Sequence, residues 1–268
     1  MKNGIELVVF DWAGTTTDFG SQAPVQVFDR TFAQYGMHFS KEEINAPMGM
    51  EKKAHIRQML SSESAGERWI AEHKMPWCED DVEKIYQSFE SNLRQVVAEY
   101  SLVIPGVAEA VRCLRNCGIK IGSTTGYTSD IMQYVLPAAK AGGYDPDCVV
   151  TPDITGWGRP TPFMLFECMR RTGVYPPSHV VKVGDTVVDI QEGKNAGAWS
   201  IGVLVGSNLM GLSQEEYNRA SEKEISERKE KAKKIYLDAG ADMVIESIRD
   251  LPEAIESINT RMNQGEKK

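Results

Sequence analysis

Four short polar segments carry the residue types that chemistry on an anionic substrate requires. Each follows an apolar run typical of a buried strand, or lies in the connection after one, and they are Asp11–Thr15, Thr124–Tyr127, Arg159 and Asp185–Asp189. In open α/β sheets, ligands bind just beyond the carboxyl ends of the strands. One such acid could simply cap a turn, because Asp is a common turn residue. Four polar segments at four strand ends instead predict a single site.

Each segment suits one part of chemistry on a phosphoryl group. The hydroxyls and backbone N–H groups near Gly126 can bind phosphate oxygens. Arg159 can clamp an anion. The carboxylates of Asp185 and Asp189 are hard oxygen ligands of the kind that Mg²⁺ prefers while it keeps positions for water and substrate phosphate. The residues themselves therefore predict a magnesium site beside a phosphoryl-binding loop.

Alternating strands and helices position these segments. Beyond about residue 100, strand-like runs alternate with helical periodicity, and the runs lie at 119–124, 148–150, 179–183, 200–205 and 242–245. This alternation is typical of a parallel sheet with helices on both faces, and the opening strand Leu7–Phe10 joins that sheet. The predicted fold class is α/β, with a doubly wound, Rossmann-like parallel sheet.

The stretch from about residue 20 to residue 100 is predicted to be wholly helical. Apolar residues recur at helical spacing over Val25–Tyr35 and Asp81–Tyr100. We therefore predict two domains, an α/β catalytic core of residues 1–19 and 101–268 and an inserted helical cap of residues 20–100. Because the insertion directly follows the Asp11 loop, it would lie over the strand ends as a lid.

The composition excludes several other classes of protein. A net charge of −8 without a basic stripe argues against nucleic-acid binding. No apolar run approaches the roughly 18 to 20 residues that span a bilayer, and the start of the chain lacks a signal-peptide pattern. The five cysteines form no Cys-x-x-Cys pair, which argues against a disulfide framework. We expect a cytoplasmic enzyme that binds neither membranes nor nucleic acid.

The four segments resemble, in order and spacing, the four motifs of the haloacid dehalogenase superfamily, and the resemblance spans nearly the whole chain. The matching residues are Asp11-x-Ala13-Gly14-Thr15, Ser123-Thr124-Thr125-Gly126, Arg159 and Gly184-Asp185-x-x-x-Asp189. The resemblance implies that Asp11 is a nucleophile that becomes an aspartyl phosphate, while Thr125 and Arg159 hold the phosphoryl group. It also implies an Mg²⁺ site made by Asp11, the Ala13 carbonyl and Asp185, with Asp189 as a ligand or as support behind the ligands.

Position 13 departs from the pattern of the phosphatases in that superfamily. They have a second Asp two residues after the nucleophile, which protonates the leaving-group oxygen, whereas this chain has Ala13. An ester-cleaving enzyme would lose a general acid worth about 10² to 10⁴ in rate. Cleavage of a carbon–phosphorus bond leaves no bridging oxygen to protonate, so Ala13 favours that reaction.

The departing carbanion of such a cleavage needs an electron sink, which a lysine Schiff base supplies. The segment Met48-Gly49-Met50-Glu51-Lys52-Lys53-Ala54-His55 resembles the Met-Gly-x-x-Lys-x-x-His segment of the phosphonoacetaldehyde hydrolase family. The segments around Asp11, Thr125 and Asp185 look like that family too. The resemblance implies that Lys52 forms the imine. It also implies substrate contacts from Met48, Gly49, His55 and Tyr127, and a homodimer through the cap.

Reasoning from the residues alone does not separate Lys52 from Lys53, since both could project from the same helix start. A lone lysine in such a place is most often a solvated surface charge. We expect Lys53 and His55 to lower the pKa of Lys52 from about 10.4 towards neutrality when the cap closes. His55 shares a helix face with Lys52, where it would orient the amine or handle its protons.

The predicted function is hydrolysis of phosphonoacetaldehyde, a small-molecule phosphonate, to acetaldehyde and phosphate through a Lys52 Schiff base and an Asp11 aspartyl phosphate. An alternative is an Mg²⁺-dependent phosphate-monoester phosphatase or phosphomutase, which would normally need an acid at Ala13. Haloacid dehalogenation would leave the Asp185 and Asp189 pair without a role. A catalytically silent binding protein could also use this fold. The apolar helix faces within residues 20–100 could form the dimer contact or pack on one another.

Overall fold

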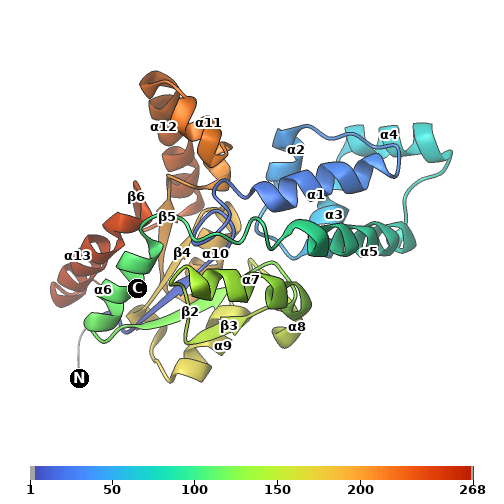
Figure 1. The fold of residues 1–268 in the computed structure, drawn as a ribbon. Coiled ribbons are helices and arrows are strands. Elements are labelled where there is room, and N and C mark those ends of the chain that lie inside the picture. Colours follow the sequence, from blue (N-terminus) through green and yellow to red (C-terminus); the bar gives the residue numbers. More distant parts are fainter. Residues whose placement is uncertain (1–3, 267) are drawn as a thin grey trace.

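A six-stranded, fully parallel sheet forms the centre of this computed structural model, which describes residues 4–266 and 268 (Figure 1). Its strand order is β3-β2-β1-β4-β5-β6. The strands are β1 Leu7–Phe10, β2 Lys120–Thr124, β3 Cys148–Val150, β4 Val180–Gly184, β5 Trp199–Val203 and β6 Met243–Ile245. The predicted α/β class and Rossmann-like parallel sheet are confirmed.

The first strand lies at the centre of the sheet and sets the register of the site. Phe10 at its end pairs with Ser123 on one side and with Val183 on the other. The segments that follow these three strands therefore emerge at one edge, as the sequence predicted. Leu7 and Val9, on one face of the strand, belong to one buried apolar cluster, while Val8 and Phe10, on the other face, belong to another. Helices consequently cover both faces of the sheet.

The helices that flank the sheet follow the predicted alternation. They are α6 Val107–Asn116, α7 Ser129–Ala141, α8 Pro152–Thr155, α9 Phe163–Thr172, α10 Val187–Ala196, α11 Gln214–Arg219, α12 Glu222–Ala239 and α13 Leu251–Asn263, with short 3₁₀ helices η1 Pro177–His179, η2 Asn208–Met210 and η3 Ile248–Asp250. The charged stretch over 214–239 forms two helices, α11 and α12, because Ser221 between them is extended and caps α12 by accepting from Glu224 N.

Between β1 and α6 the chain forms five consecutive helices, which we call the helical insert. They are α1 Gln22–Ala33, α2 Lys41–Asn45, α3 Lys52–Leu60, α4 Glu63–His73 and α5 Glu79–Val96. Figure 1 shows these helices set to one side of the sheet. The division into a core of 1–19 and 101–268 and a cap of 20–100 stays a prediction.

The apolar faces of α1 and α5 pack against each other. The rings of Phe28 and Phe89 lie 4.2 Å apart between centroids, and Asn92 Nδ2 donates to Thr31 Oγ1 at 3.0 Å. Of the two options left open by the sequence, a dimer contact or packing within the chain, these apolar faces take the second. Among the described residues, no helix is both long and apolar enough to cross a membrane.

Candidate active site

Asp11 lies at the carboxyl end of the central strand, in a loop that requires glycine. Gly14 has φ of +80°, and a Cβ at this position would lie 2.1 Å from Asp185 Oδ2. A side chain at residue 14 would thus collide with a carboxylate of the site as well as strain the backbone. Thr16 Oγ1 donates to the Asp11 carbonyl at 2.9 Å and fixes the strand end. The loop thereby brings Asp11 and Asp185 together.

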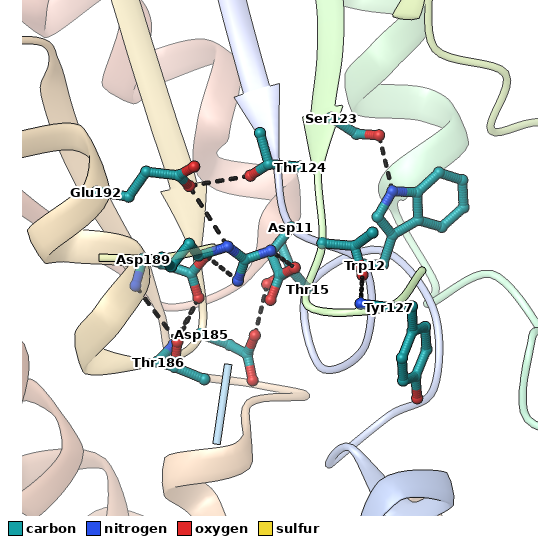
Figure 2. A network of polar contacts seen from close by, with 12 residues as sticks. Asp11, Trp12, Thr15, Ser123, Thr124, Tyr127, Asp185, Thr186, Asp189 and Glu192 are labelled. Carbon is teal, nitrogen blue, oxygen red and sulfur yellow. Dashed lines mark hydrogen bonds and ion pairs between the residues drawn. The ribbon is translucent and has the colours of Figure 1, made fainter. Parts of the chain in front are cut away.

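Behind Asp11, two cations and two further acids form a fully buried ion network (Figure 2). Arg159 donates to Asp11 Oδ1 at 2.6 Å and to Asp189 Oδ1 at 2.7 Å. Lys182 Nζ lies 2.9 Å from Asp189 Oδ1 and 3.2 Å from Glu192 Oε2. Arg159 Nε is 3.5 Å from the same Glu192 oxygen. The predicted anion clamp is thus held in place by carboxylates of the protein itself.

The network sets the protonation of its members. Burial opposes ionisation of Asp189, but Arg159 and Lys182 outweigh it and hold the pKa of Asp189 below its usual value. Asp185 has no such cation, so burial first, and then the charges of Asp11 and Asp189, raise its pKa well above the usual value. An unpaired buried carboxylate of this kind is stabilised by a bound cation.

The acids at this edge fit a hard divalent cation. Carboxylate oxygens of Asp11, Asp185 and Asp189 all lie within 4.8 Å of one another. Asp189 is saturated, however, because Oδ1 accepts from Arg159 and Lys182 while Oδ2 accepts from the Thr186 hydroxyl at 2.5 Å. The geometry therefore favours Asp11 and Asp185 as ligands and Asp189 as their support. Ala13 lines the same pocket.

Lys52 approaches this site from the helical insert. It is the first residue of α3, is only 6 % exposed and lines the pocket together with Asp11. Its Nζ lies 5.4 Å from the ring centroid of Tyr127 and 5.7 Å from that of Phe28, and it forms no ion pair with a carboxylate among the described residues. Burial outweighs the attraction of Asp11 and lowers the pKa of Lys52 to about 8.

The structure distinguishes Lys52 from Lys53. Lys53 points away from the pocket, because its Nζ pairs with Glu83 at 2.7 Å and its side chain is 40 % exposed. The expectation that Lys53 lowers the pKa of Lys52 is therefore wrong; desolvation does so first, and Arg159 is the cation that adds to it.

His55 lies behind Lys52 and does not line the pocket. Its Nε2 donates to the Ile44 carbonyl at 2.9 Å, and its ring packs against that of Phe28 at 4.1 Å between centroids, tilted by 34°. Burial first, and then the charge of Lys52, hold the pKa of His55 well below the usual value, so the ring is neutral. The predicted substrate contact of His55 stays a prediction. Its Nδ1 is buried and has no hydrogen-bond partner among the described residues.

The pocket is small, with a cavity volume of about 20 Å³. It contains most of the predicted residues, and its lining is Asp11, Ala13, Ser21, Pro24, Met48, Gly49, Lys52, Thr125, Gly126, Tyr127, Arg159 and Thr186. Gly49 has φ of +88°, and a Cβ there would lie 2.4 Å from Thr186 Oγ1. The insert thus closes on the core through a backbone contact that only glycine permits.

Two buried residues of the ion network were missed from the sequence. Lys182 donates to Thr124 Oγ1 at 2.8 Å, and Thr124 Oγ1 donates to Glu192 Oε2 at 2.9 Å. A lysine inside the apolar run of β4 was a usable signal, because such residues are buried only when paired. Glu192 offered no such signal, because α10 mixes acidic and basic residues as an ordinary solvent-exposed helix does.

Comparison with known proteins gives matches over most of the chain. A family model described as haloacid dehalogenase-like hydrolase matches residues 5–197, and one described as HAD-hydrolase-like matches residues 156–251. A phosphonoacetaldehyde hydrolase of Bacteroides fragilis is 44% identical over 97% of this chain and 98% of its own. One of Bacillus cytotoxicus is 43% identical over 95% of this chain and 96% of its own.

A solved structure has nearly the same fold throughout. The phosphonoacetaldehyde hydrolase-like protein of Oleispira antarctica superposes with a TM-score of 0.97 at 37% identity, covering 99% of this chain and 96% of that protein. The agreement therefore extends over the sheet, the helical insert and the residues between them.

Proposed function

The chain belongs to the phosphonoacetaldehyde hydrolase family of the haloacid dehalogenase-like hydrolases, and we propose that it hydrolyses phosphonoacetaldehyde to acetaldehyde and phosphate. One observation carries this proposal beyond the family. A buried amine, Lys52, shares a small pocket with a carboxylate nucleophile, Asp11, and no carboxylic acid stands at Ala13. That combination suits carbon–phosphorus cleavage rather than ester cleavage.

Lys52 begins the proposed reaction. Its lowered pKa leaves part of the amine uncharged near neutral pH, so the nitrogen can attack the aldehyde carbon. Water leaves and a protonated imine forms. The imine then withdraws electrons from the carbon that bears phosphorus, and closure of the insert keeps bulk water from it.

Asp11 performs the second step. Arg159 holds its Oδ1, and Oδ2 accepts no hydrogen bond in the described part of the chain, so this second oxygen is available as the nucleophile. An Asp11 oxygen bonds to phosphorus as the carbon–phosphorus bond breaks, and the bonding pair moves into the imine to give an enamine. Water then hydrolyses the aspartyl phosphate, and the enamine is protonated and hydrolysed to acetaldehyde.

We propose Mg²⁺ as the metal, held by Asp11, Asp185 and the Ala13 carbonyl, because the donors are hard oxygens. When bound, it would offset negative charge on the phosphoryl oxygens, the main demand of phosphoryl transfer. Arg159 contributes fixed positive charge from the core side of the pocket. Thr125 and Tyr127 would contact the phosphoryl group and the substrate from the loop after β2, and Met48 with Gly49 from the insert.

The test compares two substrates that differ by one oxygen. Phosphonoacetaldehyde should give acetaldehyde and phosphate in equal amounts, whereas glycolaldehyde phosphate, its ester counterpart, should release phosphate slowly because Ala13 cannot protonate the leaving oxygen. Faster release from the ester, without acetaldehyde from the phosphonate, would instead support the phosphatase alternative. A homodimer and a cytoplasmic location stay predictions, and light scattering of the purified chain would test the first.

A further inference from the structure

Asn208 lies where the helical insert meets the core, and it bonds to both. Its side-chain Nδ2 donates to Asn45 Oδ1, in the last residue of α2, at 2.8 Å. Its backbone N–H donates to Asp185 Oδ2 at 2.9 Å. Asn208 is only 2 % exposed. One residue therefore contacts the insert through its side chain and the metal-binding acid through its main chain.

The main chain around Asn208 is held in place, so its N–H has a fixed direction. Ser207 is fully buried and its hydroxyl accepts from Met210 N at 3.2 Å, which caps η2. The preceding Gly206 accepts from Gly20 N at 2.7 Å, at the start of the insert. Because these bonds hold the main chain, the Asn208 side chain is the part of the residue whose contact changes when the insert moves.

The Asn45 end of the contact leads to Lys52. The residue before it, Ile44, accepts from His55 Nε2 through its carbonyl. His55 and Lys52 belong to the same helix, α3. Movement of α2 away from Asn208 would therefore shift the helix that carries the amine.

We propose that Asn208 is a positioning residue whose bond to Asn45 couples closure of the helical insert to the placement of Asp185 and Lys52, the two reactive ends of the site. This inference rests on the proposed function. When the insert is open, the bond to Asn45 is lost, and only the loop around Asn208 keeps its N–H directed at Asp185. A closed insert fixes both ends together, so metal binding and imine formation favour the same closed state. Such coupling is reciprocal by linkage.

The experiment measures each end separately in Asn45→Ala, Asn208→Ala and the double variant. Asn208→Ala keeps the N–H that bonds Asp185, so only the bond to the insert is lost. Calorimetry with Mg²⁺ alone reports the Asp185 end, and borohydride trapping of phosphonoacetaldehyde on Lys52 in a chelator reports the other. Each single variant should weaken Mg²⁺ binding and slow trapping by about two- to tenfold, the effect of one hydrogen bond. The double variant should lose no more than the worse single variant, because both changes remove one bond.

Two further variants control for general damage. Asn45→Asp keeps an acceptor oxygen and should restore both readouts. Lys41→Met removes the neighbouring bond from α2 to the Gly211 carbonyl, 2.7 Å, which does not reach Asp185, so it should leave Mg²⁺ binding unchanged. Additive losses in the double variant, or unchanged Mg²⁺ binding in both single variants, would overturn the coupling. Absence of trapping in the unaltered chain would overturn the proposed function instead, while the Mg²⁺ measurement would still test the coupling.

Discussion

The two sides of the pocket treat charge in opposite ways. On the core side, Arg159 and Lys182 are buried among acids, and the pKa values of both cations are raised despite burial. On the insert side, Lys52 is equally buried but lies against the rings of Phe28 and Tyr127, and its pKa is lowered. The two cations on the core side therefore stay charged, whereas burial on the insert side favours the uncharged form of Lys52.

This difference matches two different demands. Stabilising a phosphoryl group needs permanent, oriented charge, which paired ions provide because they cannot reorient. Imine formation needs an uncharged amine, which desolvation provides because burial disfavours the ammonium form. The proposed reaction therefore has a core half and an insert half, and each can be disabled separately.

The largest effect is expected from Asp11→Asn, which removes the nucleophile of the core half. Phosphate release should fall to background at any Mg²⁺ concentration, because the amide does not attack phosphorus. Borohydride trapping at Lys52 should persist, since the insert half is untouched. Single-turnover phosphate assays check this, and substantial surviving turnover would refute the nucleophilic role of Asp11.

Removal of the metal should separate the halves without a mutation. Chelation is expected to stop phosphate release, because the buried carboxylates of Asp11 and Asp185 then face the phosphoryl group without a cation between them. Trapping at Lys52 should continue, and added Mg²⁺ should restore release. Full phosphate release after exhaustive dialysis against chelator would contradict the assigned ligands.

The pH dependence should follow the insert half. The pKa of Lys52 is lowered from 10.5 to about 8, so its uncharged fraction rises with pH and levels off above about 8. Below that value the rate of trapping should fall about tenfold for each pH unit, because only the free amine attacks the aldehyde. Rates measured between about pH 6 and 10 check this sign. A profile that keeps rising to the ordinary lysine value near 10.4 would show that Lys52 is not desolvated.

The smallest effect on turnover is expected from Glu192→Gln, which weakens the core network behind the reacting atoms. Lys182 would keep Asp189 but lose one of its two acids, and the change should lower the free energy of unfolding by about 3 to 5 kcal/mol, as for a broken buried ion pair. Turnover should fall by about tenfold at most, because Arg159 still holds Asp11. Urea unfolding measures the first effect and steady-state kinetics the second.

A matched control comes from an exposed ion pair. Glu79→Gln removes the partner of Arg57. The two side chains are 65 % and 44 % exposed, so the change should leave the free energy of unfolding almost unaltered. Equal destabilisation by Glu79→Gln and Glu192→Gln would show that the buried network has no special weight.

The sequence predicted the edge of the sheet well because each segment there is local. A strand, an acid and a glycine within a few residues place Asp11 and Asp185, and parallel pairing brings them together. Residues whose role depends on distant partners were harder to find. Glu192 meets Thr124 across 68 positions, and no short pattern announces that bond.

Which side chains of α3 face the pocket depends on burial, and residue spacing in the sequence does not reveal it. Lys52 and Lys53 are equivalent in the sequence, but their side chains leave α3 about 100° apart. The first therefore lies against two aromatic rings and the second against Glu83. His55 shares the helix with Lys52, yet the Ile44 carbonyl draws its ring into the interior of the insert. Such outcomes depend on which side of α3 faces the core, which only the packed structure defines.

Trapping the imine tests most directly whether Lys52 forms a Schiff base with the substrate. The purified chain is incubated with phosphonoacetaldehyde, reduced with borohydride and mapped by mass spectrometry, with Lys52→Met as the control. We predict one irreversible label at Lys52, loss of activity in proportion to labelling, and no label in the variant. Labelling of Lys53 instead, or full hydrolysis of the phosphonate with no label on any lysine, would contradict it.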